Sequence, residues 1–427
     1  MIKRAVVLST GDELTTGRVV DTNSNYLSGK LAEIGIDTAA VLTVGDVPER
    51  LEWAWRTAIA MGEVVISTGG IGPTADDLTN ETVARIAGVG LRSDAASVAR
   101  IRQLFAAMNR VMPENNLKQA LLPEGATVVP NPVGTAPGFR IPIALGGHRA
   151  EVIVLPGVPR EMRPMMEETV IPWLVANRGA DTVFAVRVFQ TFGISESGLD
   201  EEVAGLIAPE EGRVAFRASF PQISLRITVE DRPGAAERKL EELCTRVRAK
   251  ISQWIYAEGD ETMEGVVGRL LTDKGLTLAI AESCTGGLIG HRLTNVAGSS
   301  RYFIADLVTY SNAAKMALLG VSERTLKEHG AVSEECVLEM AAGARARIGT
   351  DLAIATSGIA GPDGGSPGRP VGTVCIALDG LGQSVARVYQ LRGARDWVKL
   401  WSSQIALDWI RRAVLGLPVK ESNVLRR

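Results

Sequence analysis

The sequence is poor in the residues that build most metal and disulfide sites. It has only three histidines and four cysteines in 427 residues, and the cysteines stand far apart at positions 244, 284, 336 and 375. No Cys-x-x-Cys pair occurs, so neither a zinc site nor a disulfide framework is indicated. We interpret the four cysteines as reduced thiols, most of them buried.

The sequence also lacks an excess of charge and any long apolar run. Lys and Arg number 46 against 49 Asp and Glu, for a net charge of −3 and no dense basic stretch. This composition gives no electrostatic footprint for nucleic acid. The N-terminal apolar run from Ala5 to Leu8 gives way at once to polar residues, and no run approaches membrane-spanning length. We therefore expect a cytoplasmic protein with no nucleic-acid or membrane partner.

What the sequence does have, in its first part, is an alternation of strands and helices. The length predicts two or three domains. The alternation is typical of an open parallel α/β sheet, which binds ligands beyond the carboxyl ends of its strands. The expected strands are 5–9, 38–44 and 64–68, and the expected helices are 23–34 and 48–61.

The richest loop of this region follows the strand at 64–68 and reads TGGIGPTADDLT. Its glycines can present backbone N–H groups to a phosphate or pyrophosphate. Its two carboxylates and a threonine can hold a divalent cation that bridges to that ligand. The residues are Gly69, Gly70, Gly72, Thr74, Asp76 and Asp77. The alternative is that the aspartates cap the helix expected at 78–87.

A second polar turn, AESCTGG at 281–287, lies between a short apolar run and a segment with helical spacing. It places Ser283 beside the backbone N–H groups of a helix start, near Gly286, where a developing oxyanion is stabilised. Ser283 is therefore a candidate nucleophile. The alternative is that Ser283 and Thr285 cap the helix, and Cys284 is a rival nucleophile because thiols are intrinsically stronger.

A serine nucleophile needs a base, and histidines are scarce. The segment VTYSNAAK at 308–315 ends a strand and begins a helix that Ser311 or Asn312 can cap. A lysine kept neutral by burial, Lys315, with Tyr310 as relay, is the more available partner. The alternative is a lysine on an exposed helix face.

A third loop, ATSGIAGPDGGS at 355–366, follows the buried strand expected at 351–355. Its hydroxyls and glycines, with those of PVGT at 370–373, let the backbone approach a polar ligand closely. We expect the three loops to form one pocket. The expected substrate contacts are Thr285, Gly286, Gly287, Thr356, Ser357, Gly358 and Thr373.

The motifs AESCTGG, VTYSNAAK, HGAVSEE and SGIAGPDGGS, followed by RPVGTV, resemble the nicotinamide mononucleotide deamidase domain at the C-terminus of CinA (competence/damage-inducible) proteins. The resemblance implies metal-free hydrolysis of the carboxamide of nicotinamide mononucleotide to the acid and ammonia. It implies Ser283 as the nucleophile, with Tyr310 and Lys315 as its activating partners. Thr356 and Arg395 would bind substrate, Arg395 through the phosphate.

The motifs GDEL, TGGIGPTADDLT, NPVGTAPG and LPGVPREM resemble the N-terminal domain of the same family, whose fold is like that of molybdopterin-binding proteins. This implies hydrolysis of the pyrophosphate of ADP-ribose with a divalent metal ion. The implied residues are Asp12, Asp76 and Asp77 for the metal, and Gly69, Gly70, Gly72 and Thr74 for phosphate. Fold alone does not choose a ligand, so a non-catalytic pterin or nucleotide binder is an alternative. A scaffold in competence or DNA-damage responses is another, with no sequence feature in its favour.

The expected architecture is α/β with three domains. A three-layer α/β/α molybdopterin-binding-like domain would span 1–172, a small α+β KH-like connecting domain 180–256 and an α/β deamidase domain 260–416. A disordered tail would follow at 417–427. The KH-like part has acidic pairs and no lysine-flanked GxxG loop, so RNA binding is not expected. The family implies a homodimer whose other partners are small nucleotides.

Overall fold

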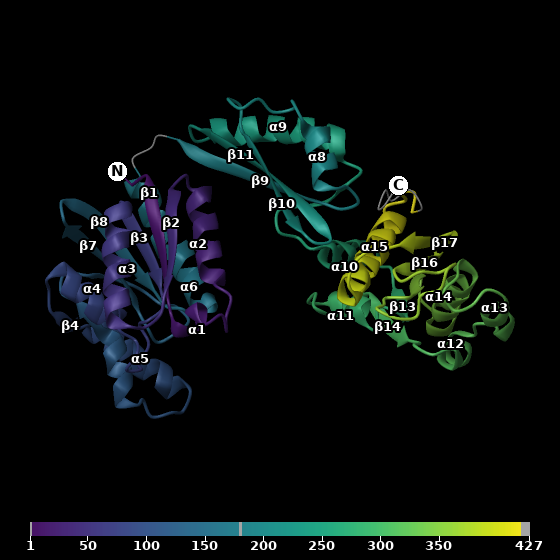
Figure 1. The fold of residues 1–427 in the computed structure, drawn as a ribbon, viewed down its shortest axis with the longest axis horizontal. Helices are drawn as coiled ribbons and strands as arrows, with labels where there is room; N and C mark the ends of the chain where they lie inside the picture. Colours follow the sequence, from purple (N-terminus) through teal and green to yellow (C-terminus); the bar gives the residue numbers. More distant parts are fainter. Residues whose placement is uncertain (1, 179–181, 420–427) are drawn as a thin grey trace. The chain divides into compact units, whose positions relative to one another are not determined.

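The computed structural model describes residues 2–178 and 182–419, which divide into two compact units (Figure 1). Unit 1 comprises Met1–Ala185 and Glu230–Ala236, and unit 2 comprises Val186–Val229 and Glu237–Arg427. The three domain boundaries drawn from the sequence stay predictions. Of the tail expected to be disordered, 420–427 lie outside the described residues, whereas Val419 is buried. Within the described part of the chain, every helix is too short or too polar to span a membrane.

Unit 1 is built on a six-stranded sheet in the order β2-β1-β3-β8-β7-β6. The first four strands in this order pair in parallel, and β7 and β6 extend the sheet in antiparallel fashion. Central β1 and β3 are buried almost throughout, as their unbroken apolar runs predict. The strands are β1 (Arg4–Thr10), β2 (Asp37–Val44), β3 (Val64–Thr68), β6 (Thr127–Val129), β7 (Gly138–Leu145) and β8 (His148–Leu155).

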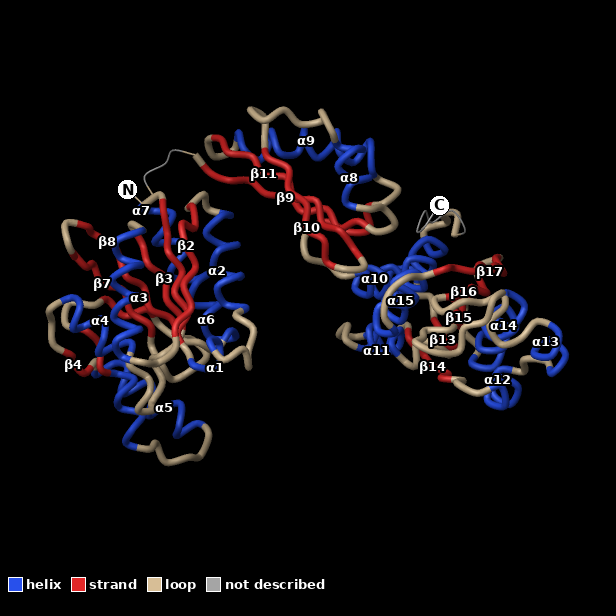
Figure 2. Tube along the Cα trace, in the orientation of Figure 1, coloured by secondary structure: helices blue, strands red, loops and turns tan. Residues whose placement is uncertain are grey.

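Helices cover both faces of this sheet, which Figure 2 shows in red between them. On one face Trp55 of α3 (Pro48–Met61) and Val83 of α4 (Thr79–Ala87) pack against the strands. On the other face Leu27 of α2 (Thr22–Glu33) and Met162 of α6 (Pro159–Met165) do the same. This confirms the expected three-layer α/β/α arrangement. The remaining elements are α1 (Asp12–Thr15), β4 (Leu91–Ser93), α5 (Ala95–Ala107), η1 (Glu114–Ala120), β5 (Leu121–Pro123), η2 (Met166–Val170) and α7 (Ile171–Asn177).

The chain then forms a four-stranded sheet in the order β10-β11-β9-β12, accompanied by two helices. The elements are β9 (Val183–Thr191), α8 (Glu196–Val203), β10 (Arg213–Ser219), β11 (Gln222–Asp231), α9 (Ala235–Ile251) and β12 (Ile255–Glu258). β10 pairs with β11 in antiparallel fashion and was not expected from the sequence. The composition is nevertheless the small α+β pattern that was expected.

The C-terminal sheet has the order β14-β13-β15-β16-β17. The first three strands in this order run parallel, and the last two are antiparallel. The strands are β13 (Leu278–Glu282), β14 (Phe303–Val308), β15 (Leu352–Gly358), β16 (Thr373–Gly380) and β17 (Gln383–Gln390). Because parallel strands end at the same edge of a sheet, the loops after β13, β14 and β15 come together.

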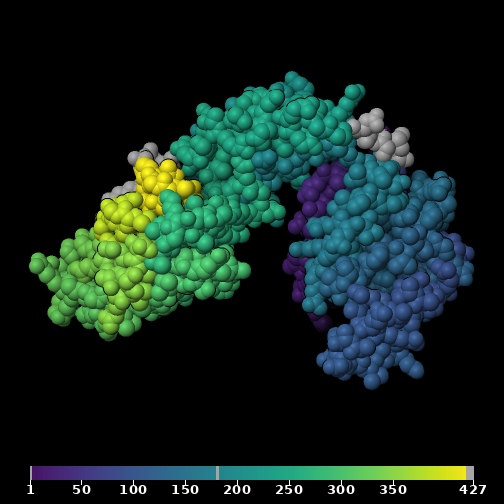
Figure 3. Space-filling model, turned by 180° about the vertical axis from the view of Figure 1, so that it is seen from behind, coloured from purple at the N-terminus to yellow at the C-terminus, as the bar shows by residue number. Residues whose placement is uncertain are grey.

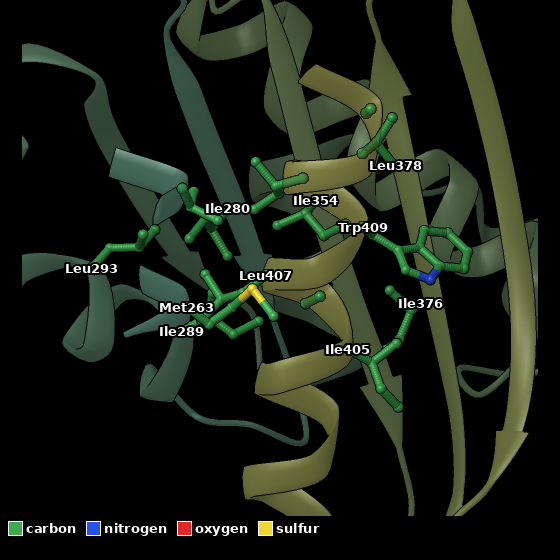
Figure 4. Packing of buried hydrophobic residues seen from close by; sticks show 14 of the residues in the cluster. Met263, Ile280, Ile289, Leu293, Ile354, Ile376, Leu378, Ile405, Leu407 and Trp409 are labelled. Carbon is green, nitrogen blue, oxygen red and sulfur yellow. The ribbon is translucent and has the colours of Figure 1, made fainter. Parts of the chain in front are cut away.

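Two different cores fix the helices on this sheet. On one face Ile280 and Ile354 pack against Leu407 and Trp409 of α15 (Arg395–Val414), as Figure 4 shows. On the other face the strands carry small residues such as Ala279, which lets α14 (Glu334–Ile348) pack closely. Side chains close the gaps that the ribbons leave within each unit (Figure 3). The other helices are α10 (Met263–Lys274), α11 (Leu288–Thr294), η3 (Ser299–Arg301), α12 (Asn312–Leu319) and α13 (Glu323–Glu328).

Candidate active site

A cavity of about 290 Å³ lies where the loops after β13, β14 and β15 meet. The expected single pocket is therefore present, and six of the candidate residues line it. They are Ser283, Tyr310, Lys315, Ser357, Gly358 and Arg395.

Five other candidates do not line this cavity. They are Thr285, Gly286, Gly287, Thr356 and Thr373. The hydroxyls of Thr285 and Thr356 hydrogen-bond each other at 2.8 Å, and both residues are fully buried. Thr373 Oγ1 donates to the carbonyl oxygen of Pro370 at 2.7 Å. These hydroxyls hold the loops together from behind the cavity.

Ser283 and Lys315 form the closest pair of reactive groups in the cavity. Lys315 Nζ donates to Ser283 Oγ at 2.9 Å and to the carbonyl oxygen of Thr309 at 2.8 Å. Lys315 is only 1% exposed, so the alternative of a lysine on an exposed helix face is wrong. Burial lowers the pKa of Lys315 because the charged ammonium loses its hydration. A larger share of the amine is then neutral and able to act as a base.

Local signals place both members of this pair. β13 ends at Glu282, and the N–H of Ser283 donates to Thr356 O at 3.0 Å, which continues the sheet for one more residue. Ser311 caps α12 by accepting from the N–H of Ala314 at 3.1 Å, as expected, so Lys315 stands one turn into the helix. The two side chains therefore meet across neighbouring strand ends.

The turn before α11 provides neither the side-chain cap nor the free N–H groups that the sequence analysis considered. The N-cap of α11 is Gly287, in the left-handed region at φ 90°, with no side-chain cap, so neither Ser283 nor Thr285 caps the helix. The N–H of Gly286 donates to Ser283 O at 3.2 Å, and the N–H of Gly287 donates to the Glu282 carboxylate at 2.8 Å. The N–H groups expected to stabilise an oxyanion near Gly286 are thus already engaged. The sequence interpretation overlooked the acidic residue that engages one of them.

Cys284 lines the cavity beside Ser283 but is a weak rival for it. The thiol is buried, and burial, followed by the charge of Glu282, raises the pKa of Cys284 to about 12. Since the thiolate is the nucleophilic form, a thiol that stays protonated is poorly reactive at neutral pH. The environment favours the hydroxyl of Ser283.

Tyr310 and Arg395 form another part of the cavity wall. Arg395 Nη2 donates to the Tyr310 hydroxyl at 2.8 Å, and Nη1 donates to the carbonyl oxygen of Gly361 at 2.8 Å. Tyr310 is 61% exposed. Among the hydrogen bonds of the described residues, none joins Tyr310 to Ser283 or Lys315. The expected tyrosine relay is therefore not assembled in this geometry.

The cavity is also lined by residues that the sequence analysis did not single out as catalytic or substrate-binding. All of them lie within or directly after the motifs quoted above, so the extent of the motifs was the available signal. They are Asn312, Ala331, Val332, Ile359, Ala360, Gly361, Asp363 and Gly364.

Unit 1 has a larger cavity, of about 620 Å³, at the carboxyl ends of β1, β3 and β8. Gly69, Gly70, Gly72, Asp76 and Asp77 line it, whereas Asp12 and Thr74 do not. Gly69 and Gly70 have φ values of 100° and 66°, a conformation that favours glycine. A Cβ at either position would also collide with Thr10 or Thr79, so the fold of this loop itself requires both glycines.

The aspartates of this loop do not cap α4. The N-cap of α4 is Leu78, and Asp77 instead accepts from the N–H of Thr74 at 2.8 Å and from its hydroxyl. The Thr74 side chain also lies beside Asp76 and lowers the pKa of Asp76. Thr74 therefore shapes the acidic end of the loop from outside the cavity.

Asp12 is held by Asp46 rather than facing the cavity. Asp12 Oδ1 accepts from the N–H of Asp46 at 3.1 Å, and the N–H of Asp12 donates to Asp46 Oδ2 at 3.0 Å. Asp46, Glu13 and Glu161 line the cavity and were missed, because their loops are brought together only by the fold. Burial, and then the neighbouring charges of Asp12, Glu13 and Asp76, raises the pKa of Asp46.

A divalent cation can be held by protein ligands alone, or by one or two carboxylates together with a bound phosphate, and the carboxylates of this cavity suit the second arrangement. In the described part of the chain, no three His, Cys, Asp or Glu residues are grouped closely enough to hold a metal by themselves. Magnesium in phosphate sites commonly uses one or two carboxylates together with the phosphate oxygens of the substrate. The crowded negative charge around Asp46, beside a glycine loop, fits this second arrangement.

Comparison with known proteins finds family matches along most of the chain. Family models match at residues 6–176 (Probable molybdopterin binding domain), 186–257 (Damage-inducible protein CinA KH domain) and 260–414 (CinA C-terminal domain). A CinA-like protein of Geotalea uraniireducens is 42% identical over 97% of this chain and 98% of its own length. The chain belongs to the CinA family.

The chain is also similar to other CinA proteins. A CinA-like protein of Geobacter sulfurreducens is 44% identical over 96% of this chain and 99% of its own length. A solved competence/damage inducible protein of Agrobacterium tumefaciens is 40% identical, covers 35% of this chain and 94% of its own, and has a TM-score of 0.34. A solved CinA superfamily protein of Klebsiella pneumoniae is 36% identical, covers 36% and 96%, and has a TM-score of 0.35.

Proposed function

We propose that residues 260–414 hydrolyse the carboxamide of nicotinamide mononucleotide to nicotinic acid mononucleotide and ammonia. The observation that carries the proposal is the buried contact of 2.9 Å between Lys315 Nζ and Ser283 Oγ. Membership of the CinA family supports the choice of substrate. The reaction class is that of a serine amidohydrolase.

The proposed reaction uses Ser283 and Lys315 in two steps. Neutral Lys315 takes the proton of Ser283 while Oγ bonds to the carboxamide carbon. Lys315 then gives this proton to the amide nitrogen as the C–N bond breaks, so ammonia leaves and an acyl ester remains on Ser283. Lys315 then deprotonates a water, which attacks the ester carbon; the bond from this carbon to Ser283 Oγ breaks, Oγ takes the proton back from Lys315, and nicotinic acid mononucleotide leaves. The Thr309 carbonyl holds Nζ in place throughout.

Arg395 is the proposed anchor for the substrate phosphate. It brings a guanidinium to the cavity wall, where its two hydrogen bonds to Tyr310 and Gly361 fix its plane. A guanidinium of fixed plane suits a phosphate because two N–H groups can bind two oxygens at once. The exposed ring of Tyr310 offers an aromatic surface on which a pyridine ring can stack.

The experiment that tests this proposal is ammonia release from nicotinamide mononucleotide in the presence of EDTA. We expect release by the wild type and loss in Ser283→Ala. Cys284→Ala is the matched control, since it removes the neighbouring cavity thiol, and it should keep activity. No release by the wild type would refute the deamidase assignment, and an active Ser283→Ala would refute the nucleophile.

For unit 1 we propose metal-dependent hydrolysis of the pyrophosphate of ADP-ribose. The cavity of about 620 Å³, which combines a glycine loop with carboxylates, favours it. One or two of Asp46, Asp76 and Asp77, together with phosphate oxygens of the substrate, would hold a divalent cation, which would neutralise phosphate charge and lower the pKa of a water. The alternative is a non-catalytic pterin or nucleotide binder, and turnover that requires metal and is lost in Asp77→Ala separates the two. The homodimer and the cytoplasmic location stay predictions.

A further inference from the structure

Glu282, the residue directly before Ser283, is an ionisable side chain at 0% exposure that the proposed reaction does not use. Its Oε2 accepts from the N–H of Gly287 at 2.8 Å, and its Oε1 accepts from the N–H of Gly290 at 2.9 Å. Both carboxylate oxygens therefore act as acceptors toward the start of α11. The turn that carries Ser283 is closed by this side chain.

Asp306 of the neighbouring strand completes the arrangement. In the parallel register of β13 and β14, Ile280 stands opposite Asp306 and Glu282 opposite Val308, so Glu282 and Asp306 lie on the same face of the sheet. The two carboxyl groups therefore face each other in a buried place, close enough for the charge of Glu282 to act on Asp306. Asp306 also lies against the backbone of α11, because a Cβ added at Gly290 would collide with Asp306 Oδ2.

Two buried carboxyl groups that face each other do not both ionise readily, so one of them keeps its proton. Both Glu282 oxygens accept N–H groups, which stabilises the ionised form of Glu282 and leaves the proton on Asp306. Burial, and then the charge of Glu282, raises the pKa of Asp306 to about 8, which agrees with this assignment. Asp306 Oδ1 is buried and accepts no hydrogen bond from the described residues, an arrangement that a neutral acid tolerates better than a carboxylate does.

The same residues connect to the proposed base. The main-chain oxygen of Glu282 accepts from the N–H of Thr309 at 2.8 Å, and the oxygen of Thr309 accepts from Lys315 Nζ at 2.8 Å. Ser283 follows Glu282 directly. One residue thus links the nucleophile turn, the start of α11 and the strand end that holds Lys315.

We propose that Glu282 and Asp306 are positioning residues: a carboxylate and a carboxylic acid that clamp the Ser283 turn onto α11 and β14, and so keep Ser283 Oγ within reach of Lys315 Nζ. The inference rests on the proposed role of Ser283 as the nucleophile. Neither residue lines the cavity, so neither is expected to touch substrate.

The test measures the nucleophile itself, with and without its substrate. The full chain, as wild type, Glu282→Gln and Asp306→Asn, is treated with a fluorophosphonate probe, and the rate of labelling at Ser283 is followed by peptide mass spectrometry. In parallel, kcat and KM are measured with nicotinamide mononucleotide. Melting temperatures show that each variant is folded, and Gly290→Ala serves as a second route, since it presses on Asp306 without changing either acid.

We expect Glu282→Gln to lower both labelling and kcat by about 10²-fold with little change in KM, as a displaced reacting group does. The reason is that glutamine replaces one of the two accepting oxygens with an amide nitrogen, which cannot accept the N–H group of Gly287 or Gly290. Asp306→Asn should stay near the wild type because an amide N–H replaces the acid proton toward Glu282. Gly290→Ala should lower labelling in the direction of Glu282→Gln.

The outcomes separate this inference from the proposed function. Equal labelling of the wild type and folded Glu282→Gln overturns the inference and leaves the deamidase proposal standing. If the wild type is labelled at Ser283 but releases no ammonia, nicotinamide mononucleotide is not the substrate. The comparison of labelling rates then still tests the positioning role of Glu282 and Asp306. A wild type that is neither labelled nor active overturns both.

Discussion

The carbonyl oxygen of Thr309 accepts a hydrogen bond of 2.8 Å from Lys315 Nζ, which leaves the amine 2.9 Å from Ser283 Oγ. Burial removes water from the Lys315 ammonium and leaves it one carbonyl and one hydroxyl as acceptors, and this loss of hydration is the physical reason that the pKa of Lys315 lies below its ordinary value. The geometry and the proton affinity of Lys315 therefore have the same origin.

The pH dependence of deamidation follows from this shift. Lys315 acts as a base only when neutral, so kcat/KM should rise with pH through the pKa of Lys315. That midpoint should lie below the ordinary lysine value of about 10.4. Lys315→Arg keeps the positive charge but has no accessible neutral form, and should lose activity. A midpoint at the ordinary value, or an active Lys315→Arg, would contradict the role of the base.

Removing the buried amine should stabilise the fold while it abolishes activity. Lys315 is 1% exposed, and the desolvation of its amine opposes folding. We expect Lys315→Met to raise the free energy of unfolding by about 1 kcal/mol or more, and so the melting temperature by a few degrees. Thermal unfolding at neutral pH measures this. A Lys315→Met protein that melts well below the wild type would show that the contacts with Ser283 and Thr309 outweigh the desolvation.

Arg395 should govern affinity more than turnover. Arg395→Ala removes the proposed phosphate anchor, so KM for nicotinamide mononucleotide should rise by about 10- to 100-fold while kcat changes less, since one charge-assisted bidentate contact is worth about 1.5–3 kcal/mol. Arg392→Ala is the matched control, because this neighbouring arginine is exposed and does not line the cavity. Equal effects of the two variants on KM would argue against the anchor.

Asp306 should make stability fall with rising pH. Its pKa is raised to about 8 by burial and by Glu282, the charged group that faces it from β13. α11 presents the backbone of Gly290 there, and its Arg292 is turned to Glu264. Because this pKa is raised, the contribution of Asp306 to the free energy of unfolding is complete below its pKa in the unfolded chain, about 3.9. This contribution is lost as pH rises through the pKa of Asp306 in the folded protein. Asp306→Asn should flatten this slope between pH 5 and 9, and parallel melting curves would contradict it.

The carboxylates of unit 1 should matter for one activity only. Asp77→Ala and EDTA should each abolish hydrolysis of ADP-ribose, by about 10²-fold or more for the variant, and leave ammonia release from nicotinamide mononucleotide unchanged. Asp37→Ala, an exposed aspartate at the start of β2, is the control and should keep both activities. Loss of both activities in Asp77→Ala would indicate a defect beyond the metal site.

The parts of the site that could be predicted depend on local sequence. Ser283 was found because it follows a buried strand, and Lys315 because it stands one turn into a capped helix; these signals lie within a few residues. The Ser311 cap was found for the same reason. Fold class followed from the alternation of apolar runs and from family motifs.

The parts that could not be predicted depend on contacts between distant segments. Glu282 was passed over because nothing nearby in the sequence shows that its carboxylate turns onto Gly287 and Gly290. Asp46 was missed because its partner, Asp12, is 34 residues away in the sequence. The alternative that Asp76 and Asp77 cap α4 was wrong because Asp77 accepts hydrogen bonds from Thr74 within the loop.

The measurement that tests the central claim most directly is rapid-quench peptide mass spectrometry of the wild type during turnover of nicotinamide mononucleotide with EDTA. We expect the Ser283 peptide to carry the mass of the substrate less ammonia, and added hydroxylamine to divert this acyl ester to a hydroxamate. Steady ammonia release with no adduct on Ser283 and no hydroxamate would contradict the serine mechanism.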